Sequence, residues 1–456
     1  MEREQLGSRL GFILLSAGCA IGIGNVWKFP YMVGQYGGGI FVLFYIFFLL
    51  ILGLPIMTME FSVGRASRKS PVKAYQQLEK QGQKWHIHGF VAMAGNYLLM
   101  MYYTVVAGWM LYYFYLTAKG AFVSASSQQV QDMFEGMLGS PQVLVTCMVI
   151  VVVVGMLINS IGLQNGLERI TKGMMLILLA LMIVLAVHSI LLPGGREGLE
   201  FYLKPDLSQI ADVGLGNTIV GAMNQAFFTL SIGMGSMAIF GSYIGKDRRL
   251  FGESINVAVL DTFVALVAGL IIFPACSAFG VEVGSGPSLI FLTLPNIFNS
   301  LSFGRLWGSL FFIFLTFAAF STVLAVFENI ISCGMDLTGC SRKKSCAVNL
   351  VLLLVLSLPC ALGYNLWSGV QPFGAGSTIM DLEDFLVSNA ILPLGSLVYV
   401  LFCTSRFGWG WKAFLKEANT GKGVRMPSGI RAYCAYVLPV IVLVLFALGI
   451  HDKFFA

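Results

Sequence analysis

Gly18-Cys-Ala-Ile-Gly-Ile-Gly-Asn-Val-Trp-Lys-Phe-Pro30 interrupts the first apolar segment of the chain with three glycines, Gly18, Gly22 and Gly24. Each glycine costs about 1 kcal/mol in a helix interior and lets the backbone leave helical geometry. Inside a bilayer, unwound backbone persists only where protein or a water-filled cavity satisfies its polar groups. Secondary transporters hold ions and substrate at such breaks near the bilayer midplane. The stretch therefore predicts a broken membrane helix and favours a transporter.

The composition indicates a polytopic membrane protein. Of the 456 residues, 57% are hydrophobic and 11% are charged, whereas a soluble domain carries about 25% charged residues. The mean hydropathy is +0.82, so little of the chain is left for a soluble domain. The nine cysteines lie mostly in apolar segments without a C-x-x-C pair, which predicts packing thiols rather than a disulfide framework.

Eleven apolar segments are long enough to cross a bilayer in a window of about 20 residues. They lie near residues 10–33, 38–63, 88–117, 143–160, 170–192, 217–243, 255–279, 306–334, 346–363, 385–404 and 431–450. The sequence therefore predicts an all-α protein with eleven transmembrane helices.

The basic residues predict the orientation of these helices. With the N-terminus in the cytoplasm, 22 of the 28 Lys and Arg residues fall on the cytoplasmic side. The positive-inside rule then predicts a cytoplasmic N-terminus and an external C-terminus. Short external loops without a glycosylation sequon favour a bacterial inner membrane, and no cleavable signal peptide is expected. Contact with anionic lipid explains the net charge of +6, with no need for nucleic acid.

A second glycine break lies in the sixth apolar segment, at Phe227-Phe-Thr-Leu-Ser-Ile-Gly-Met-Gly-Ser236. Such glycines also occur where membrane helices only pack closely. Two breaks at corresponding positions of halves with opposite topology instead favour an inverted repeat. We therefore expect one transporter domain over residues 1–456. It would contain a first repeat over 10–192, a second over 217–404 and a further helix over 431–450.

Several motifs resemble those of the neurotransmitter:sodium symporter family, which has the leucine-transporter fold. They are Gly24-Asn-Val-Trp-Lys-Phe-Pro30, Gly37-Gly-Gly39, Gly162-Leu-Gln-Asn-Gly-Leu-Glu-Arg169, Gln225-Ala-Phe-Phe-Thr-Leu-Ser231 and Phe291-Leu-Thr-Leu-Pro-Asn-Ile-Phe298. The resemblance runs from about residue 3 to residue 450. Eleven helices, without a twelfth, resemble a bacterial subgroup that transports hydrophobic and aromatic amino acids.

The resemblance implies two sodium sites built from the oxygen ligands that hard cations prefer. The first would use the Ala20 carbonyl with the side chains of Asn25, Thr229 and Asp261. The second would use the carbonyls of Gly18, Ile21 and Ala318 with the hydroxyls of Ser321 and Thr322. Such a hydroxyl pair can also be satisfied by bonds to its own helix.

Asp261 is the strongest single candidate, because a carboxylate flanked by apolar residues is costly unless it has a partner. Many relatives carry Asn here and balance charge with chloride or with a Glu at the position of Ala265. Asp261 would supply that negative charge itself, so we expect chloride not to be required. The other counterparts of a chloride site, Tyr45, Gln225 and Thr229, are present, which leaves the alternative open.

The resemblance also implies a substrate pocket for a neutral amino acid. Gly22 stands where monoamine carriers place an Asp, so the substrate would bring its own carboxylate, held at the helix end near Gly24 and by Tyr103. The lining is expected to be apolar or neutral, and Met234 favours bulky side chains while Leu99 removes some volume. The full predicted pocket is Ala20, Ile23, Gly24, Leu99, Tyr103, Phe228, Thr229, Ser231, Met234, Thr322 and Val326.

Two charged pairs are expected to gate this pocket. Lys28 with Asp384 would form the outer gate above Tyr103 and Phe228. Arg3 with Asp336, supported by Tyr243, would form the inner gate. Exposed ion pairs contribute only about 0–1 kcal/mol and can therefore open during a cycle.

The leading hypothesis is a sodium-coupled symporter that imports neutral, hydrophobic, large or aromatic L-amino acids by alternating access. The alternatives are an amino-acid sensor without transport and a proton-coupled carrier. No paired-carboxylate or His–Asp–Ser cluster at membrane depth suggests an enzyme. Beyond sodium, the amino acid and the bilayer, no cofactor or obligatory protein partner is expected.

Overall fold

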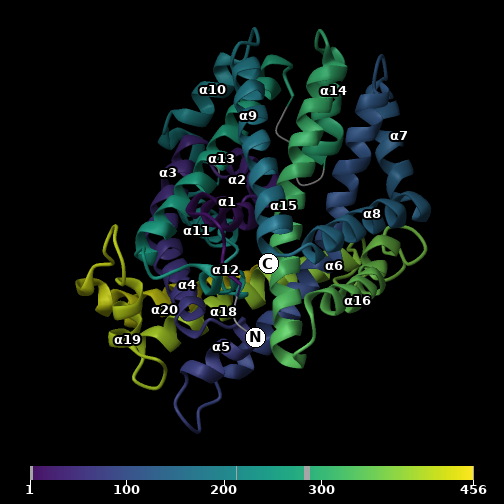
Figure 1. Ribbon diagram of the computed structural model, residues 1–456. Helices are drawn as coiled ribbons and strands as arrows, with labels where there is room; N and C mark the ends of the chain where they lie inside the picture. The colour runs from purple at the N-terminus through teal and green to yellow at the C-terminus, as the bar shows by residue number, and fades with distance from the viewer. Residues whose placement is uncertain (1–3, 212, 282–287, 455–456) are drawn as a thin grey trace.

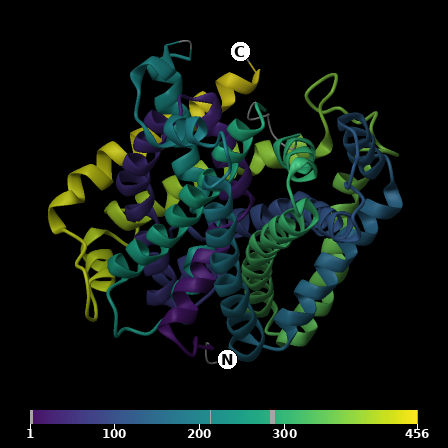
Figure 2. The same ribbon diagram turned by 90° about the horizontal axis from the view of Figure 1, so that it is seen from above.

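The computed structural model describes residues 4–211, 213–281 and 288–454. These residues form helices joined by short connections, and no β-strand, apart from one isolated bridge between Arg248 and Lys422. Figures 1 and 2 show a bundle with α8 (Pro141–Ser160) and α16 (Arg342–Leu362) at one side and α19 (Trp411–Ala418) and α20 (Leu438–Phe454) at the other.

The first half contains a broken helix followed by long spans. Its helices are α1 (Arg9–Ala20), η1 (Gly24–Lys28), α2 (Phe29–Gln35), α3 (Gly39–Phe48), η2 (Leu49–Gly53), α4 (Leu54–Ser67), α5 (Pro71–Leu78), α6 (His86–Lys119), α7 (Ser127–Leu138), η3 (Leu163–Glu168) and α9 (Arg169–Ile190), together with α8.

The rest of the chain contains the second broken helix, also followed by long spans. It comprises α10 (Arg196–Leu203), η4 (Leu207–Ile210), α11 (Leu215–Thr229), α12 (Ser236–Tyr243), α13 (Leu250–Ala278), η5 (Leu289–Thr293), α14 (Leu294–Ser300), α15 (Gly304–Thr338), α17 (Ile379–Phe385), η6 (Leu386–Ile391), α18 (Leu392–Thr404), η7 (Ser428–Ile430) and η8 (Tyr433–Val437), together with α16, α19 and α20.

The glycine stretch breaks the first helix as the sequence predicts. Ser8 caps α1 by accepting a hydrogen bond from the Gly11 amide, and the helix ends at Ala20, where Ile21 turns to extended backbone. The chain resumes as η1 and α2 after a bend of 57°. The second break separates α11 from α12, where Ser231, Gly233 and Gly235 all have positive φ. Glycine adopts this conformation without strain.

The number of spans differs from the predicted eleven. Among the described residues, nine helical segments are long and apolar enough to cross a membrane, or ten if α1 and η1–α2 form one span. The segment predicted over 217–243 forms α11 and α12, which have 15 and 8 residues. Each is shorter than the roughly 20 residues that a continuous spanning helix needs.

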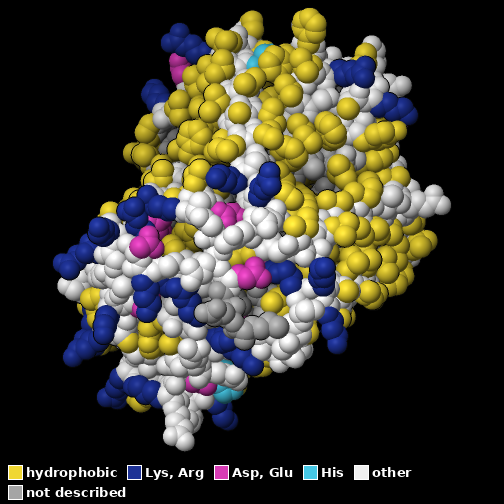
Figure 3. Space-filling view, viewed as in Figure 1, with side chains coloured by type: hydrophobic (Ala, Val, Ile, Leu, Met, Phe, Trp, Pro, Cys, Tyr) yellow, Lys and Arg dark blue, Asp and Glu magenta, His cyan; other side chains and the backbone are white. Residues whose placement is uncertain are grey.

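The two breaks lie in the middle of the bundle. Helix α15 packs along α6 and against α1, and α12 packs against α4. The centre of the molecule is thus lined by the broken helices on one side and by α6 and α15 on the other. Figure 3 shows a broad hydrophobic surface, and below it Lys and Arg side chains gathered over the region where α5 and α19 lie in Figure 1.

Candidate functional site

The two unwound segments meet each other and α6. The Gln225 amide nitrogen donates to the Gly24 carbonyl over 3.1 Å, and the Ser231 hydroxyl donates to the Cys19 carbonyl over 3.4 Å. From α6, the Tyr103 hydroxyl accepts a hydrogen bond from the Ile23 amide over 3.0 Å. Backbone polar groups that the breaks release are therefore met by side chains, as a membrane interior requires.

Three residues of the first expected ion site converge. The Asn25 amide donates to one Asp261 carboxylate oxygen over 2.9 Å, and the Thr229 hydroxyl donates to the other over 3.1 Å. Asp261 is fully buried, and none of the ion pairs formed by the described residues involves it. The fourth residue, Ala20, lines the adjacent cavity. A buried carboxylate without a countercharge is a natural partner for a bound cation.

All five residues of the second expected site lie together. The Ser321 hydroxyl is 2.9 Å from the Gly18 carbonyl, 3.4 Å from that of Ile21 and 2.9 Å from that of Ala318. The Thr322 hydroxyl is 3.2 Å from the Gly18 carbonyl and 3.3 Å from that of Ile21. Each hydroxyl has one proton to donate, so these oxygens present more lone pairs than protons. Such an oxygen-rich group has the chemistry of a hard-cation site.

A small cavity adjoins both ion clusters. Its volume is about 30 Å³, close to the space of one water molecule. Nine of the eleven expected pocket residues line it: Ala20, Gly24, Leu99, Tyr103, Phe228, Thr229, Ser231, Met234 and Thr322.

The other two expected pocket residues, Ile23 and Val326, are not part of this lining. Val326 is 1% exposed and packs in the core. The lining also includes Cys19, Gly22, Val387 and Leu392. The last two come from η6 and α18, and no motif in the sequence marks them.

The expected outer gate has a different geometry from the predicted one. The Lys28 ammonium lies 3.8 Å from the centroid of the Phe228 ring, a cation–π arrangement. Asp384 accepts hydrogen bonds from the hydroxyls of Tyr102 and Ser388, each over 2.9 Å. Within the described chain, no ion pair closer than 4.0 Å joins Lys28 to Asp384, although the two charges are near enough to interact.

The expected inner gate is only partly covered, because Arg3 lies outside the described residues. Asp336 accepts a hydrogen bond from the Ser70 amide over 2.6 Å. The Tyr243 hydroxyl contacts Glu328 and lies 2.6 Å from the Ser332 hydroxyl. Asp336 and Tyr243 therefore each have polar partners near the N-terminal segment other than the expected Arg3.

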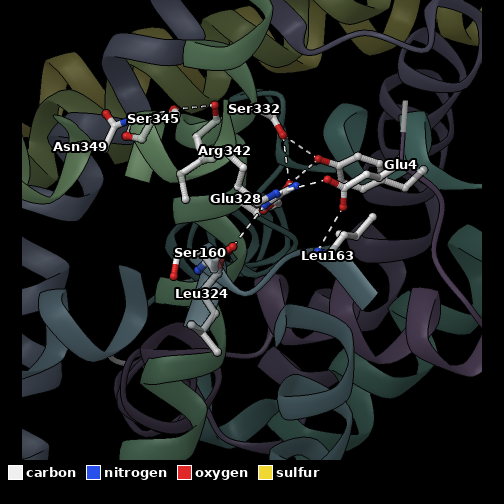
Figure 4. A network of polar contacts seen from close by, with 12 residues as sticks. Glu4, Ser160, Leu163, Leu324, Glu328, Ser332, Arg342, Ser345 and Asn349 are labelled. Carbon is white, nitrogen blue, oxygen red and sulfur yellow. Dashed lines mark hydrogen bonds and ion pairs between the residues drawn. The ribbon is translucent and has the colours of Figure 1, made fainter. Parts of the chain in front are cut away.

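A charged network that the sequence did not suggest lies beside Tyr243 (Figure 4). Arg342 contacts the buried Glu328 over 2.6 Å, and Glu4 lies 3.3 Å from Arg342. Glu4 also accepts a hydrogen bond from the Leu163 amide over 3.1 Å. The network ties the N-terminal segment to η3, α15 and α16. The one sequence feature that could have indicated this network is Glu328, a single Glu in the apolar sequence of α15.

The chain is similar to known sodium-dependent transporters. The model of the sodium:neurotransmitter symporter family matches residues 3–129 and 122–453. The uncharacterized sodium-dependent transporter YhdH of Bacillus subtilis is 34% identical over 398 residues, which cover 87% of each chain. An uncharacterized sodium-dependent transporter of Haemophilus influenzae is 30% identical over 457 residues, covering 98% of each.

A solved structure is similar along the whole chain. The crystal structure of MhsT in complex with L-phenylalanine has a TM-score of 0.87 and 35% sequence identity, and the match covers 98% of this chain and 100% of that one.

Proposed function

The chain belongs to the sodium:neurotransmitter symporter family, and on that premise we propose that it imports neutral, large hydrophobic or aromatic L-amino acids together with sodium. It is a sodium-dependent transporter and not an enzyme. In the proposed cycle, sodium stabilises the closed form of the two breaks around the substrate, and the sodium gradient drives accumulation by alternating access. The inverted repeats over 10–192 and 217–404 would supply the two halves.

The observation that carries the sodium proposal is the second oxygen cluster. Ser321 and Thr322 of α15 both face the Gly18 and Ile21 carbonyls of the break in α1. A cation bound there would join α1 to α15, and its loss would leave carbonyl oxygens facing each other. Sodium at this position thus provides a physical link between ion binding and the conformation of the broken helix.

The first cluster supports sodium in direct contact with substrate. Asp261, Asn25 and Thr229 form one wall, and the cavity that Ala20 and Thr229 also line forms the other. An amino-acid carboxylate in this cavity would complete the ligands of a cation held by Asp261. The Tyr103 hydroxyl lines the cavity and would be a donor to that carboxylate, and the Ile23 amide holds this hydroxyl by donating to it.

The substrate class follows from the lining. The residues around the cavity carry no charged side chain, so a charged substrate side chain would be desolvated without a partner. Because the cavity measures about 30 Å³, an aromatic side chain requires its walls to move. Met234 has an unbranched, flexible side chain that suits such repacking. The complex of MhsT with L-phenylalanine supports the choice of an aromatic probe.

We further propose that chloride is not required. A chloride ion near Tyr45, Gln225 and Thr229 would lie close to Asp261, and two negative charges in a buried site disfavour each other. The Tyr45 hydroxyl and the Gln225 carbonyl oxygen have no hydrogen-bond partner among the described residues. Both groups therefore remain able to form a polar contact, which is why the chloride requirement has to be tested. Uptake that is unchanged when gluconate replaces chloride would support the proposal, and abolished uptake would refute it.

Equilibrium binding tests the sodium sites. Purified protein should bind L-phenylalanine in sodium chloride and lose this binding in choline chloride. Ser321→Ala should raise the sodium concentration for half-maximal binding by about tenfold, equivalent to ~1.4 kcal/mol. The matched control is Ser309→Ala, because that hydroxyl lies on the same helix and bonds to its own helix at the Arg305 carbonyl. Equal sodium dependence in both variants would disprove the second site.

A further inference from the structure

Glu383 of α17 differs from the other buried carboxylates of the described chain. Its side chain is 3% exposed, and neither carboxylate oxygen has an N–H or O–H partner among the described residues. Each of the other buried carboxylates accepts hydrogen bonds or an ion pair. They are Glu60, Glu168, Glu253, Asp261 and Glu328.

The groups around Glu383 offer little to stabilise a negative charge. The Cys360 thiol of α16 and the Tyr364 phenol of the turn after α16 lie near it, and a thiol is a weak donor. The Tyr364 hydroxyl lies 3.3 Å from the Met380 sulfur. From α6, Tyr102 is near, but its hydroxyl donates to Asp384 instead.

Two further carboxylates lie on the same helix. Asp381 caps α17 by accepting from the Thr378 amide over 2.7 Å, and Asp384 belongs to the expected outer gate. Lys28, the cation of that gate, lies over the Phe228 ring. Like charges nearby and a buried, donor-poor position both disfavour an ionised carboxyl. The neutral acid is therefore the form that this position accommodates.

We propose that Glu383 is a proton-binding site that is occupied while the Tyr102–Asp384 hydrogen bond joins α6 to α17, as in this structure. Opening the gate must part α17 from α6, because the Tyr102–Asp384 hydrogen bond joins these helices. Water then reaches the neighbouring Glu383, and its proton passes from the carboxyl oxygen to that water. Closing reverses the transfer. The role of this region as an outer gate rests on the proposed function, whereas the protonated carboxyl does not.

Infrared spectroscopy tests the protonated carboxyl without any substrate. The spectrum of reconstituted wild-type protein minus that of Glu383→Gln, at neutral pH, should contain a carboxylic-acid C=O band that shifts in D₂O. Gln has the shape of the neutral acid, so this variant should fold. The exposed Glu135 provides the control, and Glu135→Gln should remove carboxylate bands only. Loss of carboxylate bands in Glu383→Gln would overturn the proposal.

The pH dependence of binding tests the link to the gate. If closing takes up one proton, the affinity for L-phenylalanine at saturating sodium should rise as pH falls, by up to about tenfold per pH unit above the pKa of the open form. This component should vanish in Glu383→Gln and persist in Glu135→Gln. Identical pH profiles for wild type and Glu383→Gln would overturn the link. Absence of any binding in wild type would instead count against the proposed function, and the infrared result would still decide the proton site.

Discussion

Gly22 shows how one residue controls the candidate substrate site. A Cβ at this position would lie 2.2 Å from the Tyr103 hydroxyl oxygen and 2.7 Å from the Thr322 hydroxyl oxygen. Both distances are far below van der Waals contact, and both neighbours belong to the expected site. The absence of a side chain therefore lets α6 and α15 approach the broken helix from two sides.

Gly22→Ala should weaken sodium-dependent binding of L-phenylalanine by about tenfold or more, or ~1.4 kcal/mol, because the new methyl group displaces Tyr103 and Thr322. Equilibrium binding would measure this loss. Gly173→Ala is the matched control, since nothing lies within 4 Å of a Cβ there. If Gly22→Ala binds as tightly as Gly173→Ala, Tyr103 and Thr322 do not form the site.

At the scale of single elements, the second break depends on a carboxylate from another helix. Glu60 of α4 accepts hydrogen bonds from the Gly233 amide over 2.8 Å and from the Met237 amide over 3.1 Å. These amides belong to the unwound segment and the start of α12, whose own helix leaves them without carbonyl partners. Glu60 therefore holds α12 in its bent position.

Glu60→Gln should lower the free energy of unfolding by about 1–3 kcal/mol, because one of the two acceptor oxygens becomes an amide donor facing an amide. The thermal unfolding midpoint in detergent would report this change. Glu200→Gln, in an exposed pair with Arg196, should leave the midpoint nearly unchanged. Equal midpoints in the two variants would show that Glu60 is not a brace.

The charged network of Glu4, Glu328 and Arg342 links elements that are far apart in sequence. Arg342 is 11% exposed and Glu328 is fully buried, so removing the arginine takes a positive charge away from a buried carboxylate. Breaking such a pair costs about 3–5 kcal/mol.

Arg342→Ala should therefore loosen the N-terminal end of α1, which the Glu4–Arg342 contact helps to hold. Amide hydrogen exchange over residues 7–18 should become faster than in wild type. Lys343→Ala, which changes a neighbouring exposed residue, should not have this effect. Unchanged exchange in Arg342→Ala would mean that the network does not restrain the N-terminal segment.

The breaks were predictable because they follow from local chemistry, and glycine in an apolar segment is a local signal. Ser321 and Thr322 were also visible as hydroxyls in apolar sequence, although their place in an ion site came from the family resemblance. Val387 of the cavity lining and the partners of Lys28 were not predictable. Val387 is an ordinary apolar residue, and the position of Lys28 over Phe228 depends on how η1 packs against α11.

At the scale of the whole molecule, charge is distributed unevenly. Lys and Arg side chains gather over the region of α5 and α19 (Figure 3), and the N-terminal segment lies on the same side through Leu6, whose amide donates to the Tyr243 carbonyl. This distribution agrees with the orientation that the positive-inside rule predicts from the sequence.

Reporter fusions at the C-terminus would test this orientation. If α11 and α12 together make one crossing, the chain has the predicted eleven. With a cytoplasmic N-terminus, a C-terminal alkaline phosphatase should then be active and a C-terminal green fluorescent protein should be dark. Fusion after residue 341, in the basic connection between α15 and α16, should give the opposite pair of signals. A fluorescent C-terminal fusion would contradict the predicted orientation or the predicted number of crossings.

The most direct test of the central claim is uptake of radiolabelled L-phenylalanine into proteoliposomes. An inward sodium gradient would be compared with choline at constant chloride and pH. Accumulation above the external concentration that occurs only with the sodium gradient is the predicted result. Sodium-dependent binding without uptake would indicate a sensor, and uptake that is indifferent to sodium but follows a proton gradient would indicate a proton-coupled carrier. Either result would contradict sodium-coupled symport.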